Sequence, residues 1–513
     1  MTQWEQFKGA PWRSEHPALH ASELSVKPAP EYASSEVLLS ALYRRIGFID
    51  VGEKAVPVNG RDLLKRVESG KAPAGAGLRG EEWSRVLQGS LESPKLPNQS
   101  AKRFLQLTPL VPEVTRYSGS ARLSGSPWSP GDLIERMVLL GSPSRIAAES
   151  LWQRLFVALK VAGDDDVWAR WLEAELAVWR PSSSAAGFAL QPLEHPWPER
   201  FLACDGGSLA YPAKQFVRDL DAIISVKEQM TRRQWTSLLE AVLRIAAIAH
   251  VMWLCDVTQR MWSRVHTALQ GDPGDGGQHG GGDGQSIYPR NLAYFPYGRA
   301  AMDQAKVLVS RYLYARLGLN TVLWGLNEIG HPFTEPLSDS SALDRLVAAI
   351  AGNRAAIQRL GVLATWQDLQ ESEARVLGCT KGIGSNVLEF IRHGIGQRQT
   401  ARDVLRGYDQ GYSIRKRTND ARARWVVGLG PVAVIAMAHC CLQETGGARS
   451  VRRLCDHLAK YGISIGRDEV ASSDLGQKLR LLGLVLDSPD AESGMLVLPP
   501  FPRSTIRNTS PTE

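Results

Sequence analysis

Positively charged residues are concentrated in one stretch of the chain, from Lys381 to Arg424. This stretch holds ten lysines and arginines and four acidic residues, so it carries +6 of the net charge of +7 of the 513-residue chain. A local excess of cations is typical of a surface that contacts phosphates. The residues expected to make such contacts are Lys381, Gly382, Gly384, Arg392, Arg398, Arg402, Arg406, Arg415, Lys416, Arg417, Arg422 and Arg424, with Lys478 and Arg480 further along.

The spacing within this stretch supports the same interpretation. Arg398, Arg402 and Arg406 follow one another at intervals of four residues around Thr400, a predicted helix N-cap. Like charges one helical turn apart repel each other by a few tenths of a kcal/mol, and a bound anion would remove that cost. A solvent-exposed helix face or an acidic protein partner would give the same pattern.

Four further residues have the types of a metal-dependent nuclease. They are Asp219, Asp221, Lys227 and Glu228. Paired carboxylates can hold Mg²⁺ and a lysine can assist a water, but an acidic helix yields a similar set by chance. The chain has no Gly-x-x-x-x-Gly-Lys, His-Glu-x-x-His or Gly-x-Ser-x-Gly motif. The catalytic residues are therefore unknown, and the absence of a motif favours a protein that is not an enzyme.

Metal ligands occur at two other places. His439, Cys440 and Cys441 are consecutive, and Cys455 lies two residues before His457. Zinc sites usually use knuckle spacings such as Cys-x-x-Cys, so buried packing is the favoured interpretation. Three aspartates at 164–166 precede a helical run and are predicted to cap it. The sequence predicts no metal and no cofactor.

A glycine motif opens the basic stretch. The segment 382–392 begins Gly382-Ile383-Gly384 and resembles the second half of a helix-hairpin-helix motif, with Leu388 and Ile391 at the expected apolar positions. The resemblance implies backbone N–H groups that approach a phosphate at the start of a helix, beside the charge of Lys381. An ordinary turn between two helices is the alternative.

Residues 431–501 resemble a winged-helix domain in the order of their elements. Three predicted helices lie at 431–444, 450–461 and around Leu475 to Leu482, and two strands at 484–487 and 495–498 flank a turn-rich tip. The resemblance implies that the third helix presents Gln477, Lys478 and Arg480 to a major groove. The acidic tip, with Asp487, Asp490 and Glu492, would repel phosphates, so a protein-binding use stays open.

Length and composition set the architecture. A chain of 513 residues exceeds the roughly 250 to 300 residues at which a single core stops growing, so several domains are expected. Apolar periodicity predicts a mainly α, multidomain fold with two helices across 232–270 and a C-terminal winged helix. The expected parts are a loop-rich N-terminal domain (1–128), a helical domain (129–270), a glycine-rich flexible loop (271–286), a helical domain (287–365), a helix-hairpin-helix-like basic segment (366–430) and the winged helix (431–505).

The chain begins without a basic and apolar signal sequence, and its longest uncharged run, 426–443, is interrupted by glycines, a proline and a histidine. A cytoplasmic location without a membrane is expected. The sequence thus predicts a DNA- or other nucleic-acid-binding subunit of a bacterial multi-protein complex, with protein partners, in genome (antiviral) defence or mobile-element biology. A nuclease with an unrecognised site and a protein–protein scaffold are the alternatives. Strand preference, partner identity and oligomeric state are not encoded in any motif.

Overall fold

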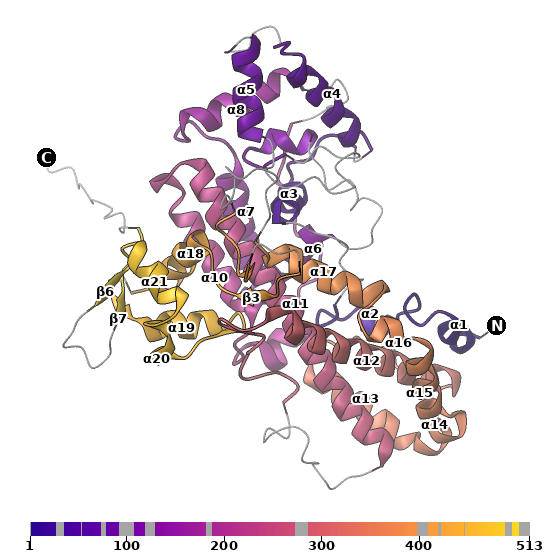
Figure 1. Ribbon diagram of the computed structural model, residues 1–513. Coiled ribbons are helices and arrows are strands. Elements are labelled where there is room, and N and C mark those ends of the chain that lie inside the picture. The colour runs from indigo at the N-terminus through magenta and orange to yellow at the C-terminus, as the bar shows by residue number, and fades with distance from the viewer. Residues whose placement is uncertain are drawn as a thin grey trace, which may run out of the picture.

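The fold is mainly helical, as the apolar periodicity predicts (Figure 1). The computed structural model describes residues 2–26, 35–52, 54–72, 78, 80–91, 107–117, 129–180, 187–271, 286–397, 409–418, 422–445, 447–487 and 495–501. Most of the predicted glycine-rich loop, residues 272–285, lies outside these ranges, and the predicted domain boundaries remain predictions.

In the described residues of the first half of the chain, the named elements are all helices. They are α1 (Gln3–Gly9), α2 (Pro17–His20), α3 (Ser35–Ile46), α4 (Val56–Glu68), α5 (Gly80–Leu91), η1 (Pro112–Arg116), α6 (Pro130–Gly141), α7 (Arg145–Leu159), α8 (Val167–Val178), α9 (Glu199–Phe201), η3 (Leu202–Gly206), α10 (Pro212–Ser225), η4 (Lys227–Gln229) and α11 (Arg232–Gln270). Side chains that cap the first backbone N–H groups determine where two of these helices begin. Ser129 caps α6, and Asp166 caps α8 by accepting from two backbone N–H groups, so the predicted capping is confirmed for this one of the three aspartates.

The second half adds short strands to the helices. Its elements are β1 (Phe295–Pro296), α12 (Ala301–Glu328), α13 (Ser340–Gly352), α14 (Arg354–Leu360), α15 (Val362–Ser372), α16 (Ala374–Leu377), α17 (Gly382–Ile395), β2 (Ile414–Lys416), β3 (Trp425–Val427), α18 (Pro431–Leu442), β4 (Arg449–Ser450), α19 (Val451–Ala459), β5 (Ile463–Ser464), α20 (Arg467–Val470), α21 (Asp474–Leu481), β6 (Val485–Asp487) and β7 (Met495–Val497).

Helix α11 is the centre of the molecule. It runs unbroken for 39 residues where the sequence predicted two helices, because no glycine or proline interrupts it between the capping box of Thr231 and Gln234 and the left-handed Gly271. It packs against α10, α12, α13 and α18. Among the described residues it is also the one helix long and apolar enough to cross a membrane, but 94% of its most apolar window is buried inside the protein. Its apolar side chains therefore form the core.

Buried apolar residues form two clusters. The larger cluster extends from Trp4 to Val497 and joins the N-terminal, central and C-terminal helices. The smaller one lies in the lobe of α4, α5, η1 and α8 at the top of Figure 1, around the fully buried Trp83. A single continuous core thus holds the C-terminal elements against the central helices.

The C-terminal elements form a compact unit of helices and a small antiparallel sheet. The strand order is β4-β7-β6, so a strand that precedes α19 pairs with the last strand of the chain. Strand β5 leaves this unit and pairs in parallel with β1, and β2 pairs with β3 in a separate antiparallel hairpin. The β1–β5 pairing joins a segment before α12 to the C-terminal unit, whereas the β2–β3 hairpin is local in sequence.

Candidate functional site

The basic stretch is divided in space by α17. Lys381 is the N-cap of this helix, and Gly396, just beyond its other end, is bridged to Ile414 of β2. With 14 residues at about 1.5 Å each, the helix separates the two ends by roughly 20 Å. Lys381 and the later cations therefore belong to different parts of the surface.

The two glycines at the start of α17 have different roles. Gly382 has a φ of 60°, a left-handed conformation that favours glycine. A Cβ on Gly384 would lie 2.6 Å from the carbonyl oxygen of Val376 and 2.8 Å from Leu313, so this glycine permits close packing against α16 and α12. The second glycine thus serves the protein interior, while Lys381 and Gly382 are exposed at the helix start.

The later cations gather on the hairpin of β2 and β3. Lys416 faces Trp425 across the pair, with its ammonium 6.0 Å from the ring centroid. Beyond the strands, the backbone N–H of Arg417 donates to the carbonyl oxygen of Arg424 at 3.0 Å. Arg417, Arg422 and Arg424 are all exposed at this end of the hairpin. We call the five residues Arg415, Lys416, Arg417, Arg422 and Arg424 the hairpin cations.

The hairpin lies beside α21. Arg415 is 3.9 Å from the carboxylate of Asp474, the first residue of that helix. Lys478 donates to the carbonyl oxygen of Leu429 and to Asp474, both at 2.6 Å, and its ammonium is 5.7 Å from the ring centroid of Tyr412. Lys478 is therefore engaged within the protein and joins α21 to the segment after β3.

Other predicted contact residues are placed differently. Arg480 is exposed on α21 and donates to the carbonyl oxygen of Ala471 at 2.9 Å. Arg392 is ion-paired with Glu389 on its own helix, so its charge is balanced locally. The spaced arginines Arg398, Arg402 and Arg406 lie outside the described residues, and their predicted role remains a prediction.

The two carboxylates that α10 contributes to the set considered for a nuclease have separate partners, and Lys227 is ion-paired with Asp165 at 3.3 Å. Asp219 is 1% exposed and accepts from Tyr461 at 2.6 Å and from Gln215 at 2.7 Å, with Nε2 of His457 at 3.0 Å. Asp221 lies two residues further on α10 and is ion-paired with the exposed Arg154. Residues two apart on a helix point to different sides, which is why these carboxylates do not share a ligand position.

The histidine and cysteine groups likewise have structural partners. His439 contacts the carbonyl oxygen of Ala222 at 3.1 Å, and His457 contacts Asp219. Burial raises the pKa of the Cys441 thiol to about 12 and raises that of Cys440 as well, so both thiols stay neutral at physiological pH. Neutral buried thiols agree with the packing interpretation.

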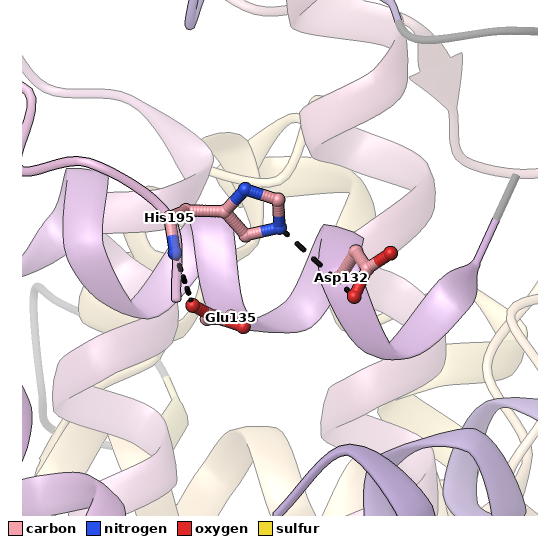
Figure 2. A group of neighbouring side chains, drawn as sticks. All are labelled: Asp132, Glu135 and His195. Atoms are coloured by element: carbon pink, nitrogen blue, oxygen red, sulfur yellow. Dashed lines mark hydrogen bonds and ion pairs between the residues drawn. The ribbon is translucent and has the colours of Figure 1, made fainter. Parts of the chain in front are cut away.

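One group of potential metal ligands occurs among the described residues, and no motif or spacing in the sequence indicates it. Asp132, Glu135 and His195 each offer an atom within 4.8 Å of the others (Figure 2). The carboxylate of Glu135 accepts the backbone N–H groups of Glu194 and His195 at 2.6 and 2.8 Å. Nε2 of His195 is 3.9 Å from Asp132.

The guanidinium of Arg45 lies beside these carboxylates and supplies the positive charge that a metal cation would otherwise supply. Arg45 of α3 is ion-paired with the fully buried Glu135, and its Nε lies 3.4 Å from Asp132. Burial, followed by the charge of Arg136, lowers the pKa of His195. With both oxygens of Glu135 engaged by protein donors, the cluster is an internal ion-pair network that fixes the loop before His195 to α6 and α3.

This cluster borders a cavity of about 310 Å³ between α6, α11 and the segment after α2. Its walls combine leucines with His20, Glu23, Asp132, Arg136, His195 and His250. Ligand pockets commonly have such a volume and such a mixture of apolar walls with a few polar groups.

Comparison with known proteins gives no assignment. No protein-family model matches the chain, and no curated protein matches it at a significant level. The functional conclusion therefore depends on the geometry alone.

Proposed function

We propose that this protein binds nucleic acid, with DNA as the expected target, through the hairpin cations and the neighbouring α21. The observation that carries the proposal is the grouping of Arg415, Lys416, Arg417, Arg422 and Arg424 on one short hairpin that contacts α21. Phosphate contacts of this kind position a protein on a duplex without reading its sequence.

The C-terminal unit supports the proposal through its topology. From α18 to β7 it has a helix, a strand, helices and a final hairpin, and its sheet order is β4-β7-β6. The small strands do not by themselves establish a winged helix; in the winged helix that we propose, α21 would take the position of the third, groove-reading helix. Gln477, Arg480 and Leu481 form its exposed face, at intervals of three and four residues.

The distribution of charge explains why the β2–β3 hairpin and α21 would bind DNA together. The charges from Pro431 to Glu513 cancel, so a winged helix alone would attract DNA weakly. The hairpin cations supply positive charge next to α21. We infer that the hairpin cations contact the phosphate backbone of DNA while the exposed face of α21 approaches its major groove. Membership in a larger complex, including one of genome defence, remains a prediction from the sequence.

Fluorescence anisotropy of labelled double- and single-stranded DNA across a salt series tests this proposal. The variant Arg417→Ala/Arg422→Ala/Arg424→Ala should bind more weakly, and its log–log salt slope should shrink by about two to three, at about 0.9 per lost duplex contact. The matched control is Arg85→Ala/Arg145→Ala/Arg170→Ala, which removes the same charge from exposed positions on α5, α7 and α8.

The control variant distinguishes DNA binding at the hairpin surface from binding that depends only on the net charge of the protein. If both triple variants lose the same affinity, binding follows the overall charge and the hairpin is not the interface. If the wild-type chain does not bind either form of DNA at low salt, the proposal is wrong. Salt-sensitive binding to an acidic protein in that case would support the scaffold alternative.

A further inference from the structure

The cavity between α6 and α11 has features that the proposed nucleic-acid interface does not use. Its apolar wall includes Leu133, Leu139, Leu140 and Leu254. At about 30 Å³ per water, a volume of 310 Å³ corresponds to roughly ten waters, which is enough space for a small organic ligand. The remaining question is what its charged groups would recognise.

Arg136 provides a positive charge in the cavity wall. It is half-buried on α6, and no ion pair or hydrogen bond joins its guanidinium to another residue within the described part of the chain. Burial lowers the pKa of Arg136, and the charges of Asp132, Glu23 and Glu135 act in the opposite direction without a direct ion pair. A buried charge is costly unless it is paired, so this guanidinium favours an anionic group of a ligand.

Glu23 provides the opposite charge in the same wall. Its Oε2 is buried and has no hydrogen-bond partner, and the same is true of Nδ1 of His250, a side chain that is 2% exposed. Burial lowers the pKa of His250 to about 3, so its imidazole is neutral and can donate or accept a hydrogen bond. The cavity therefore combines an unpaired cation, a carboxylate oxygen without a partner and a neutral polar ring.

We propose that this cavity binds a small zwitterion with an apolar body, of the α-amino-acid class. Its carboxylate would pair with Arg136, its ammonium with Glu23, and its side chain would lie against the leucines. A simple anion would leave Oε2 of Glu23 without a hydrogen-bond partner, and a simple amine would leave the Arg136 guanidinium without one. A ligand with both charges satisfies both groups at once.

Isothermal titration calorimetry on the full chain tests the proposal with L-leucine, L-phenylalanine and L-tryptophan. At least one should bind at micromolar to millimolar concentration. For phenylalanine, the matched analogues are 3-phenylpropanoate, which lacks the ammonium group, and 2-phenylethylamine, which lacks the carboxylate. Each analogue should bind at least tenfold more weakly than the amino acid.

Two substitutions assign the charges to the residues. Arg136→Gln should weaken binding of the preferred amino acid at least tenfold and leave the weak binding of its amine analogue unchanged. Glu23→Gln should also weaken binding of the amino acid at least tenfold, and it should leave the weak binding of the analogue that lacks the ammonium group unchanged. Arg154→Gln, at an exposed position on α7, is the control for net charge. Circular dichroism and the melting temperature establish that each variant is folded, and Arg136→Lys should restore part of the affinity.

Absence of binding by all three amino acids at millimolar concentration overturns the proposal. Equal binding of an amino acid and its two analogues also overturns it, because apolar contact alone would then explain the affinity. These outcomes are independent of DNA binding, which uses a different surface.

Discussion

Asp219 should be a structural residue that holds the C-terminal unit to the central helices. It lies on α10, and two of its three polar neighbours, His457 and Tyr461, come from α19 and the residues directly after it. The third is Gln215 on the same helix, at 2.7 Å. Asp219→Ala would remove the acceptor that all three share.

The expected loss follows from burial. Tyr461 is fully buried, and His457 and Gln215 are 5% and 7% exposed, so water would not readily replace the carboxylate. An unsatisfied buried polar group costs about 1–3 kcal/mol, so the three groups that lose their acceptor give about 3 to 9 kcal/mol for Asp219→Ala. That is a large part of the roughly 5–15 kcal/mol by which a typical domain is stable.

The neighbouring Asp221 gives a matched control. Its partner Arg154 is 51% exposed, and an exposed ion pair contributes about 0–1 kcal/mol, so Asp221→Ala should have little effect. Hydrogen exchange of α19 and urea unfolding would measure the difference. Asp219→Asn keeps the shape and one acceptor, and it should lose less than Asp219→Ala.

Two results would refute this reasoning. Similar stability of the Asp219→Ala and Asp221→Ala chains would show that the buried network contributes little. Intact stability combined with loss of a metal-dependent DNA cleavage in both variants would instead restore the nuclease hypothesis.

Other changes have equally definite expectations. Gly384→Ala should destabilise the chain by about 1–3 kcal/mol in urea unfolding, because its Cβ would lie 2.6 Å from the Val376 oxygen; Gly352→Ala, where nothing lies within 4 Å, should not. The pKa of His250 is lowered from 6.5 to about 3, so between these pH values the unfolded chain binds more protons than the folded chain. The free energy of unfolding therefore decreases as the pH is lowered through this range. At 1.36 kcal/mol per pH unit, the wild type should lose about 2 kcal/mol between pH 7 and pH 5 that a His250→Gln variant keeps. Parallel pH dependence of both chains would show that His250 does not titrate as described.

Much of the local structure could be predicted from the sequence. Asp166 caps a helix where the sequence indicates, and the apolar run after Pro431 forms the buried helix α18. These features depend on side chains that act on their own helix, within a few residues. Because these local effects act within each helix, the sequence correctly predicts a mainly helical fold. It is wrong about α11 only in predicting two helices where one continuous helix forms.

The parts of the candidate sites depended on contacts between distant segments. The sequence could not indicate that Lys478 turns inward to Leu429, because the two are 49 residues apart. Nor could it bring Asp132 and Glu135 to His195, about 60 residues further on, or separate Lys381 from the hairpin cations by the length of α17.

The sequence by itself determined where charge is concentrated and which segments form helices, because composition and periodicity act locally. Only the tertiary structure decided which charges meet. Packing pairs Arg45 with Glu135, while Arg136, one residue further on α6, faces a cavity instead. Adjacent positions on a helix point about 100° apart, so their environments depend on which other elements the core places around them.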